Sequence, residues 1–85
     1  MPRISIFFGI VVYMYYDDHP PSHFHAQYEG SDCMFSLNGD LLKGAMSPRA
    51  LKLIKEWAVL HHDELHENWE RCVNDMPLNW IKPLR

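Results

Sequence analysis

The stretch DDHPPSHFHAQYEG, residues 17–30, contains an interruption of regular structure followed by the start of a strand. Pro20 and Pro21 cannot lie in a central strand, because proline has no amide hydrogen to donate to a neighbouring strand. After them, apolar and polar residues alternate as they do in a half-buried strand. Phe24, Ala26 and Tyr28 fall on one face, and His23, His25, Gln27 and Glu29 fall on the other. The stretch therefore predicts a loop and then a strand that carries two histidines on an open face.

Further strands are expected on both sides of this stretch. Their expected positions are residues 4–7, residues 10–16, a strand through Cys33, Phe35 and Leu37, and a weaker strand at residues 41–45. These segments are rich in the β-branched and aromatic residues that fit a pleated surface. Gly9 marks the first turn, although Phe8 fits the left-handed angles of a tight turn poorly. Asn38 and Gly39 predict a type I′ hairpin turn.

The second half of the chain has the pattern of a helix. Ser47 is a good N-cap, and Pro48 suits the first helical position. Apolar or aromatic residues then recur at helical spacing: Ala50, Ile54, Trp57, Ala58, His61, Leu65, Trp69 and Cys72. A single helix over residues 48–74 would be about 40 Å long. A break near His62–Asp63, with Asp63 capping a second helix, is the alternative to one long helix.

These elements predict an α+β fold. We expect an antiparallel β-meander of four to five strands over residues 4–46, packed by a C-terminal helical segment over residues 48–74. The 85 residues suffice for a single domain with a thin core, which dimerisation or a partner would enlarge. Trp80, Ile81 and Leu84 are expected to hold the C-terminal segment against this body. The three tryptophans, Trp57, Trp69 and Trp80, are expected to anchor the core or an interface.

Composition restricts the classes of function. The net charge of −3 argues mildly against strong nucleic-acid binding. Cys33 and Cys72 are too few for a disulfide scaffold, so we interpret them as reduced core thiols. The apolar run over residues 4–16 is followed by no small-residue cleavage site and is shorter than the about 20 residues that span a bilayer. We therefore expect a cytoplasmic protein without a membrane partner.

The histidines near the prolines suggest two kinds of site. His23 and His25 leave the same face of a strand, so they could chelate a divalent transition metal such as zinc, with His19, Asp17 or Asp18 as a third ligand from the loop. Alternatively, His19, His23 and His25 could act as general acid and base in metal-free RNA cleavage.

If the chain cleaves RNA, tyrosines and cations would help to hold the phosphate of the RNA. Tyr16 would assist the histidines as a catalytic group, and Tyr28, Arg49 and Lys52 would bind the substrate. A third interpretation is that the histidines only line an exposed face. His62 and His66, spaced four residues apart, could also hold a metal on a helix, but we interpret them as surface residues.

Several motifs are similar to a known family. GIVVYMYYDDHPPSHFHAQY, residues 9–28, resembles the start of a bacterial family named domain of unknown function 4160, whose hallmark reads DHPPPHFHA, with Ser22 in place of a proline here. The resemblance continues in RALKLIKEWAVLHHDELHENWE, residues 49–70, and in the closing IKPL.

The resemblance implies a small bacterial cytoplasmic protein whose gene lies beside one for another small protein. Such pairs are commonly proposed to be toxin–antitoxin modules. We therefore expect the toxin-like component of such a pair, an RNA-cleaving enzyme that uses the histidine cluster. The alternative is a non-catalytic metal-binding or protein-interaction module. Its expected partner is the small cognate protein from the neighbouring gene or a second copy of this chain.

Overall fold

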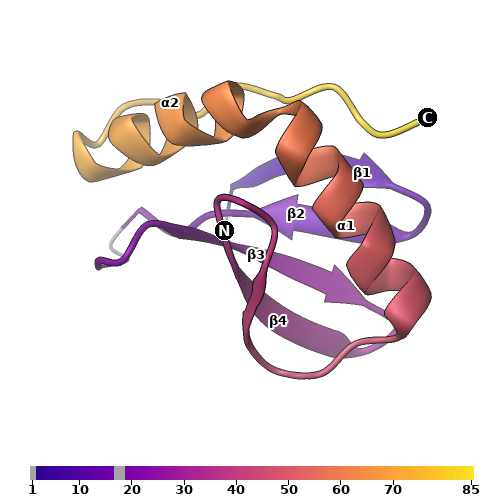
Figure 1. Ribbon diagram of the computed structural model, residues 1–85. Helices are drawn as coiled ribbons and strands as arrows, with labels where there is room; N and C mark the ends of the chain where they lie inside the picture. Colours follow the sequence, from indigo (N-terminus) through magenta and orange to yellow (C-terminus); the bar gives the residue numbers. More distant parts are fainter. Residues whose placement is uncertain (1, 17–18) are drawn as a thin grey trace.

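A computed structural model describes residues 2–16 and 19–85 of the chain. A five-stranded antiparallel sheet precedes two helices (Figure 1). The elements are β1 (Arg3–Phe7), β2 (Ile10–Tyr13), β3 (His23–Tyr28), β4 (Ser31–Ser36), β5 (Leu41–Lys43), α1 (Pro48–Leu60) and α2 (His62–Val73). The strands lie in sequence order, so the sheet is a meander. The predicted α+β fold is confirmed.

One face of the sheet forms the core with α1. Val12, Ala26 and Cys33 are cross-strand partners on this face, and all three are buried. Small residues in this row leave room for the helix that crosses the sheet in Figure 1. Trp57 of α1 fills that space, because its ring lies 5.3 Å from that of Phe7 and 5.7 Å from that of Phe24.

Helix α1 begins as the sequence predicts. The Ser47 hydroxyl accepts a hydrogen bond from the amide of Ala50 at 3.2 Å, and Pro48 occupies the first turn. The helical segment is divided, so the single long helix is wrong. The alternative of two helices is confirmed, with the break at His61, just before the expected His62–Asp63. Asp63 lies within the first turn of α2 instead of capping it.

The predicted turn at Gly9 is confirmed, whereas the turn at Asn38–Gly39 differs from expectation. Phe8 adopts the left-handed angles of a two-residue turn with Gly9, at φ values of 50° and 78°. Asn38 does not have a positive φ, so the expected type I′ turn is wrong. Instead, Gly39 donates its amide to Ser36 and has a φ of 87°, which makes a three-residue loop. This loop brings Gly39 against α1, where a Cβ atom would lie 2.9 Å from that of Ala58.

The C-terminal segment lies along the helices and the edge of β1. The amide of Ile81 donates to the carbonyl of Ile4 at 2.7 Å, and Ile81 is buried. Leu84 also packs against the core. Trp80 does not, since 56% of it is exposed, and the expectation that it anchors the segment is wrong.

Two expectations from composition can be compared with the structure. Cys33 and Cys72 are buried thiols, as the sequence predicts. Among the described residues, neither helix has the length and apolar character that crossing a membrane requires.

Candidate functional site

The face of the sheet opposite α1 carries a row of five cross-strand partners. The row contains one residue from each strand: Arg3, Tyr13, His25, Met34 and Lys43. Directly opposed residues in a sheet point to the same side. We call this set the second-face row. Arg3 and Lys43 are exposed at its two ends, and His25 is half-buried at its centre.

Aromatic rings form the centre of the row. The ring of His25 stacks on that of Tyr13 at 5.3 Å with an interplanar angle of 15°. Tyr15 meets His25 edge-on at 4.9 Å, and 37% of Tyr15 is exposed. Tyr13 is fully buried beneath them. The rings therefore hold one another in a fixed arrangement that extends to the surface.

A carboxylate holds the buried tyrosine. The hydroxyl of Tyr13 donates to Asp32, a residue on β4. Burial, and then the hydrogen bond to the Asp32 carboxylate, raises the pKa of Tyr13 well above its usual value. Tyr13 therefore keeps its proton at any physiological pH, and it acts as a hydrogen-bond donor and a platform for His25.

His23 does not lie on an open face, which corrects the sequence prediction. Only 3% of it is exposed, because Trp69 of α2 lies over its ring at 5.2 Å. On its other side it contacts His25 at 5.0 Å. Its Nδ1 lies 2.7 Å from the carbonyl oxygen of Pro21. Since a carbonyl only accepts, Nδ1 carries a proton and ties the proline loop to the start of β3.

The remaining residues of the predicted histidine site are divided between two ends of the sheet. His19 and Tyr16 are exposed in the loop before β3. Asp17 and Asp18 lie outside the described residues. Tyr28 ends β3, five residues and about 16 Å along the strand from His23.

One of the predicted substrate-binding cations, Arg49, lies near Tyr28. A hydrogen bond to Glu29 raises the pKa of Tyr28, and the nearby charge of Arg49 opposes this effect. Arg49 and Lys52 are exposed in the first turns of α1. The structure therefore does not bring them beside His23 and His25. The cations that share a row with His25 are Arg3 and Lys43.

The predicted metal site lacks a compact set of ligands in the structure. Over residues 2–16 and 19–85, no three or more His, Cys, Asp or Glu side chains lie close enough together to hold one ion. His19, His23 and His25 alone therefore do not form a three-ligand site.

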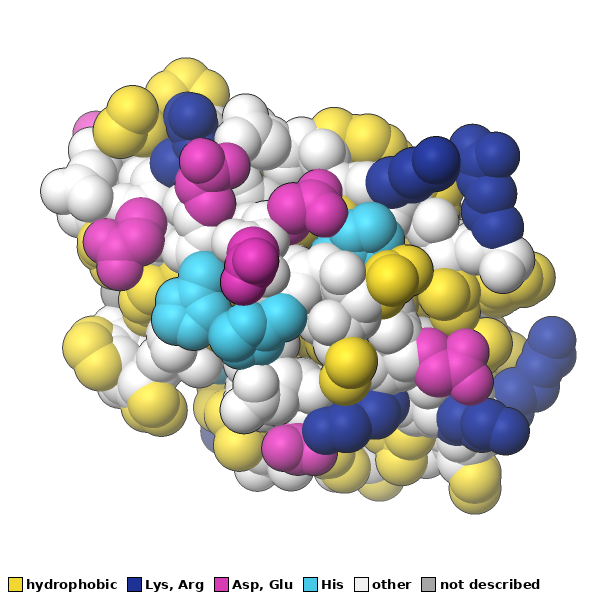
Figure 2. All heavy atoms as spheres, turned by 45° about the horizontal axis from the view of Figure 1, so that its top comes forward, with side chains coloured by type: hydrophobic (Ala, Val, Ile, Leu, Met, Phe, Trp, Pro, Cys, Tyr) yellow, Lys and Arg dark blue, Asp and Glu magenta, His cyan; other side chains and the backbone are white. Residues whose placement is uncertain are grey.

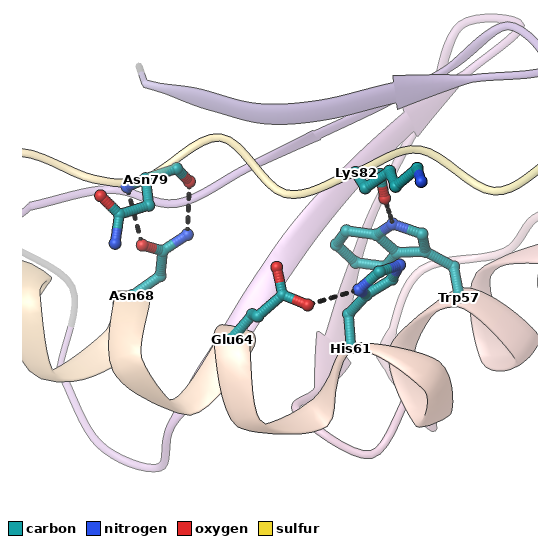
Figure 3. Close-up of polar contacts among 6 residues, drawn as sticks. All are labelled: Trp57, His61, Glu64, Asn68, Asn79 and Lys82. Atoms are coloured by element: carbon teal, nitrogen blue, oxygen red, sulfur yellow. Dashed lines mark hydrogen bonds and ion pairs between the residues drawn. The ribbon is translucent and has the colours of Figure 1, made fainter.

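A second polar cluster joins the two helices and the C-terminal segment (Figure 3). Nδ1 of His61 lies 2.6 Å from a carboxylate oxygen of Glu64, and the indole nitrogen of Trp57 donates to the carbonyl of Lys82 at 3.0 Å. The buried amide of Asn68 makes two hydrogen bonds of 2.9 Å to the backbone of Asn79. The His61–Glu64 contact is exposed, whereas the bonds of Trp57 and Asn68 are partly buried and tie the helices to the C-terminal segment, so we interpret the cluster as structural.

Sequence reasoning missed most of the second-face row. Alternation along residues 10–16 does place Val11, Tyr13 and Tyr15 on one face. The sequence does not give the register between strands. Arg3, His25 and Lys43 are aligned with Tyr13 only by that register. The carboxylate of Asp32 was missed for the same reason.

The fold and this surface define the class of protein: a small two-layer α+β domain with a basic, aromatic and histidine-containing face on a five-stranded sheet. Residues 9–70 match the model of the family described as domain of unknown function DUF4160. This match covers more than half of the chain, which therefore belongs to that family. No curated protein and no solved structure matches the chain.

Proposed function

We propose that this chain is the toxin-like member of a toxin–antitoxin pair and acts as a protein-interaction module. Its partner would be the small cognate protein encoded beside it, bound across the second-face row. The observation that carries the proposal is the fixed stack of Tyr13, His25 and Tyr15, which reaches the surface between two exposed cations. Rigid aromatic side chains lose little entropy on binding and are common at protein interfaces.

Apolar contacts on the same face favour a protein over RNA. Ile6 is exposed there, and Val11 and Met34 are half-buried. Tyr13 is covered and so offers no ring for stacking with a base. The net charge of −3 would also repel a polyanion. With Arg3 and Lys43 at the ends of the row, the complementary protein surface would be apolar at its centre and acidic at its rim.

The geometry gives catalysis less support than binding. Acid–base cleavage needs two histidines that both reach the substrate. His23 is buried, and its Nδ1 is bonded to Pro21. His25 and His19 are the more accessible histidines of this region. An RNA-cleaving enzyme would therefore have to use these two without the help of His23.

Co-expression with the neighbouring gene tests the proposal. The untagged chain should form a complex with the partner in size-exclusion chromatography, and the partner should relieve any growth arrest that the chain causes alone. The double variant Arg3→Glu, Lys43→Glu should lose the complex. The matched control, Arg49→Glu with Lys52→Glu, changes the net charge equally at the other end of the sheet and should retain it.

Two outcomes would overturn the proposal. One is a complex that survives reversal of both charges in the second-face row. The other is cleavage of RNA by the purified chain that disappears in His25→Ala while the partner still binds, which would establish an enzyme.

A further inference from the structure

A pair of histidines on α2 lies outside the second-face row. His62 and His66 are four residues apart, on the same side of the helix. Their rings are in contact, with centroids 4.8 Å apart and planes at 66°. Figure 2 shows histidine side chains gathered on this side of the molecule beside acidic ones. Neither ring is buried, since His62 is half-buried and His66 is exposed.

We propose that His62 and His66 chelate one divalent transition-metal ion, such as Ni²⁺, Cu²⁺ or Zn²⁺. Imidazole nitrogens suit these ions and bind them at about 2.0–2.1 Å. Side chains on adjacent helical turns can place two nitrogens around one ion without distortion of the backbone. The site has two protein ligands, because no cluster of three or more exists among the described residues, and water completes the coordination.

The charges around the pair favour a cation. Helix α2 contains four acidic residues and one basic residue: Asp63, Glu64, Glu67 and Glu70 against Arg71. A local excess of negative charge raises the concentration of cations at the surface. The same charges would repel an anion from the two histidines.

A neighbouring carboxylate adds negative charge directly beside the pair. Nδ1 of His62 lies 3.8 Å from a carboxylate oxygen of Asp63, which is too long for a hydrogen bond but close enough for attraction between charges. The carboxylate therefore favours a cation beside His62.

Ion binding would join the first two turns of α2, directly after the break at His61. The first turn of a helix is the part that frays most readily, because its amides have no partners within the helix. A ligand that binds only the folded state raises its stability. We therefore expect the metal to raise the melting temperature of the whole chain.

Calorimetric titration of the tag-free protein with NiCl₂ tests the site. We expect saturable binding of one ion per chain and a higher melting temperature. His62→Ala and His66→Ala should each weaken binding at least tenfold. Because both side chains contact solvent, these variants should melt like the wild type when no metal is present.

His19→Ala and His25→Ala serve as controls, since they remove histidines from the other surface. Both should bind Ni²⁺ as the wild type does, and amide resonances in the first two turns of α2 should broaden as the paramagnetic ion is added. The absence of saturable binding would overturn the proposal. So would binding that is lost in His25→Ala but kept in His66→Ala, because the ion would then lie at the second-face row.

Discussion

At the scale of single residues, two neighbouring histidines of β3 have different roles. His23 is enclosed by Trp69, His25 and the Pro21 carbonyl, whereas His25 reaches the surface of the second face. Alternation predicted correctly that both rings leave the same side of the strand. It could not predict that α2 would cover one of them, because that depends on where the helix packs.

The burial of His23 gives a first prediction. His23→Ala should lower the free energy of unfolding by about 2–3 kcal/mol, because it leaves a cavity beside Trp69 and removes the donor to Pro21. Gln27→Ala, at an exposed position of the same strand, should change it by less than about 0.5 kcal/mol. Urea denaturation measures both. Equal stability of the two variants would show that the His23 ring is not part of the packed interior.

The raised pKa of Tyr13 gives a second prediction, which concerns alkaline pH. Burial and the Asp32 carboxylate hold the pKa of the folded state above the unfolded value of 10.0. This contribution to stability is complete below about pH 10 and is lost as the pH rises further, because the unfolded state then releases a proton that the folded state keeps. In Tyr13→Phe, the contribution is absent at every pH.

Tyrosinate absorbance during a pH titration is the measurement. In the wild type, one tyrosine should stay protonated until the protein unfolds, and this late component should be missing in Tyr13→Phe. Ionisation of Tyr13 near pH 10 without unfolding would contradict the buried hydrogen bond.

At the scale of elements, the turn after β4 packs so closely against α1 that only glycine fits at position 39. Gly39 has a φ of 87°, and a Cβ atom there would lie 2.9 Å from Cβ of Ala58 and 3.1 Å from Cα of Lys55. Gly30 has a similar φ of 82° but faces open space. The two positions therefore separate the cost of the backbone angle from the cost of the collision.

We expect Gly30→Ala to cost about 1–2 kcal/mol, the usual penalty of the left-handed conformation. Gly39→Ala should cost about 1–3 kcal/mol more, since overpacking against α1 is added. The comparison is made by urea unfolding of both variants. A cost at Gly39 no greater than that at Gly30 would mean that the turn does not pack against α1 as the structure shows.

The position of the C-terminal segment depends on the buried side-chain amide of Asn68. Asn68→Ala removes both hydrogen bonds to the backbone of Asn79 and should cost about 2 kcal/mol. The amide of Ile81, which bonds to Ile4, should then exchange its hydrogen faster. Asn74→Ala is the control, because that side chain bonds only to an exposed turn of its own helix. Unchanged exchange at Ile81 in Asn68→Ala would show that other contacts hold the segment.

The elements themselves could largely be predicted from the sequence, whereas their junctions could not. Alternation around Phe24 and the Ser47–Pro48 cap depend on local chemistry and are confirmed. The break near His62–Asp63 was one of two alternatives that local patterns left open, and the loop at Gly39 depends on its contact with α1. Such contacts join residues far apart in the chain, so local patterns do not contain them.

At the scale of the whole molecule, the two layers produce two unlike surfaces. Helix α1 covers one face of the sheet, α2 reaches over His23, and the outer side of α2 carries acidic residues and the pair His62 and His66. The other face carries the second-face row between two cations. The sequence predicted one open surface for His23 and His25 and assigned Arg49 and Lys52 to it. The structure buries His23, and the strand register that places Arg3 and Lys43 in a row with His25 exists only in the folded sheet.

The central claim is that the second face binds a protein partner, and NMR mapping tests it most directly. The ¹⁵N-labelled chain is titrated with the unlabelled product of the neighbouring gene, and amide shifts are followed along all five strands. We predict that the largest changes occur at Arg3, Tyr15, His25, Met34 and Lys43, with little change at Tyr28, Arg49 and Lys52. Changes confined to α2 or to the Tyr28 end of the sheet, or no changes at all, would contradict the account.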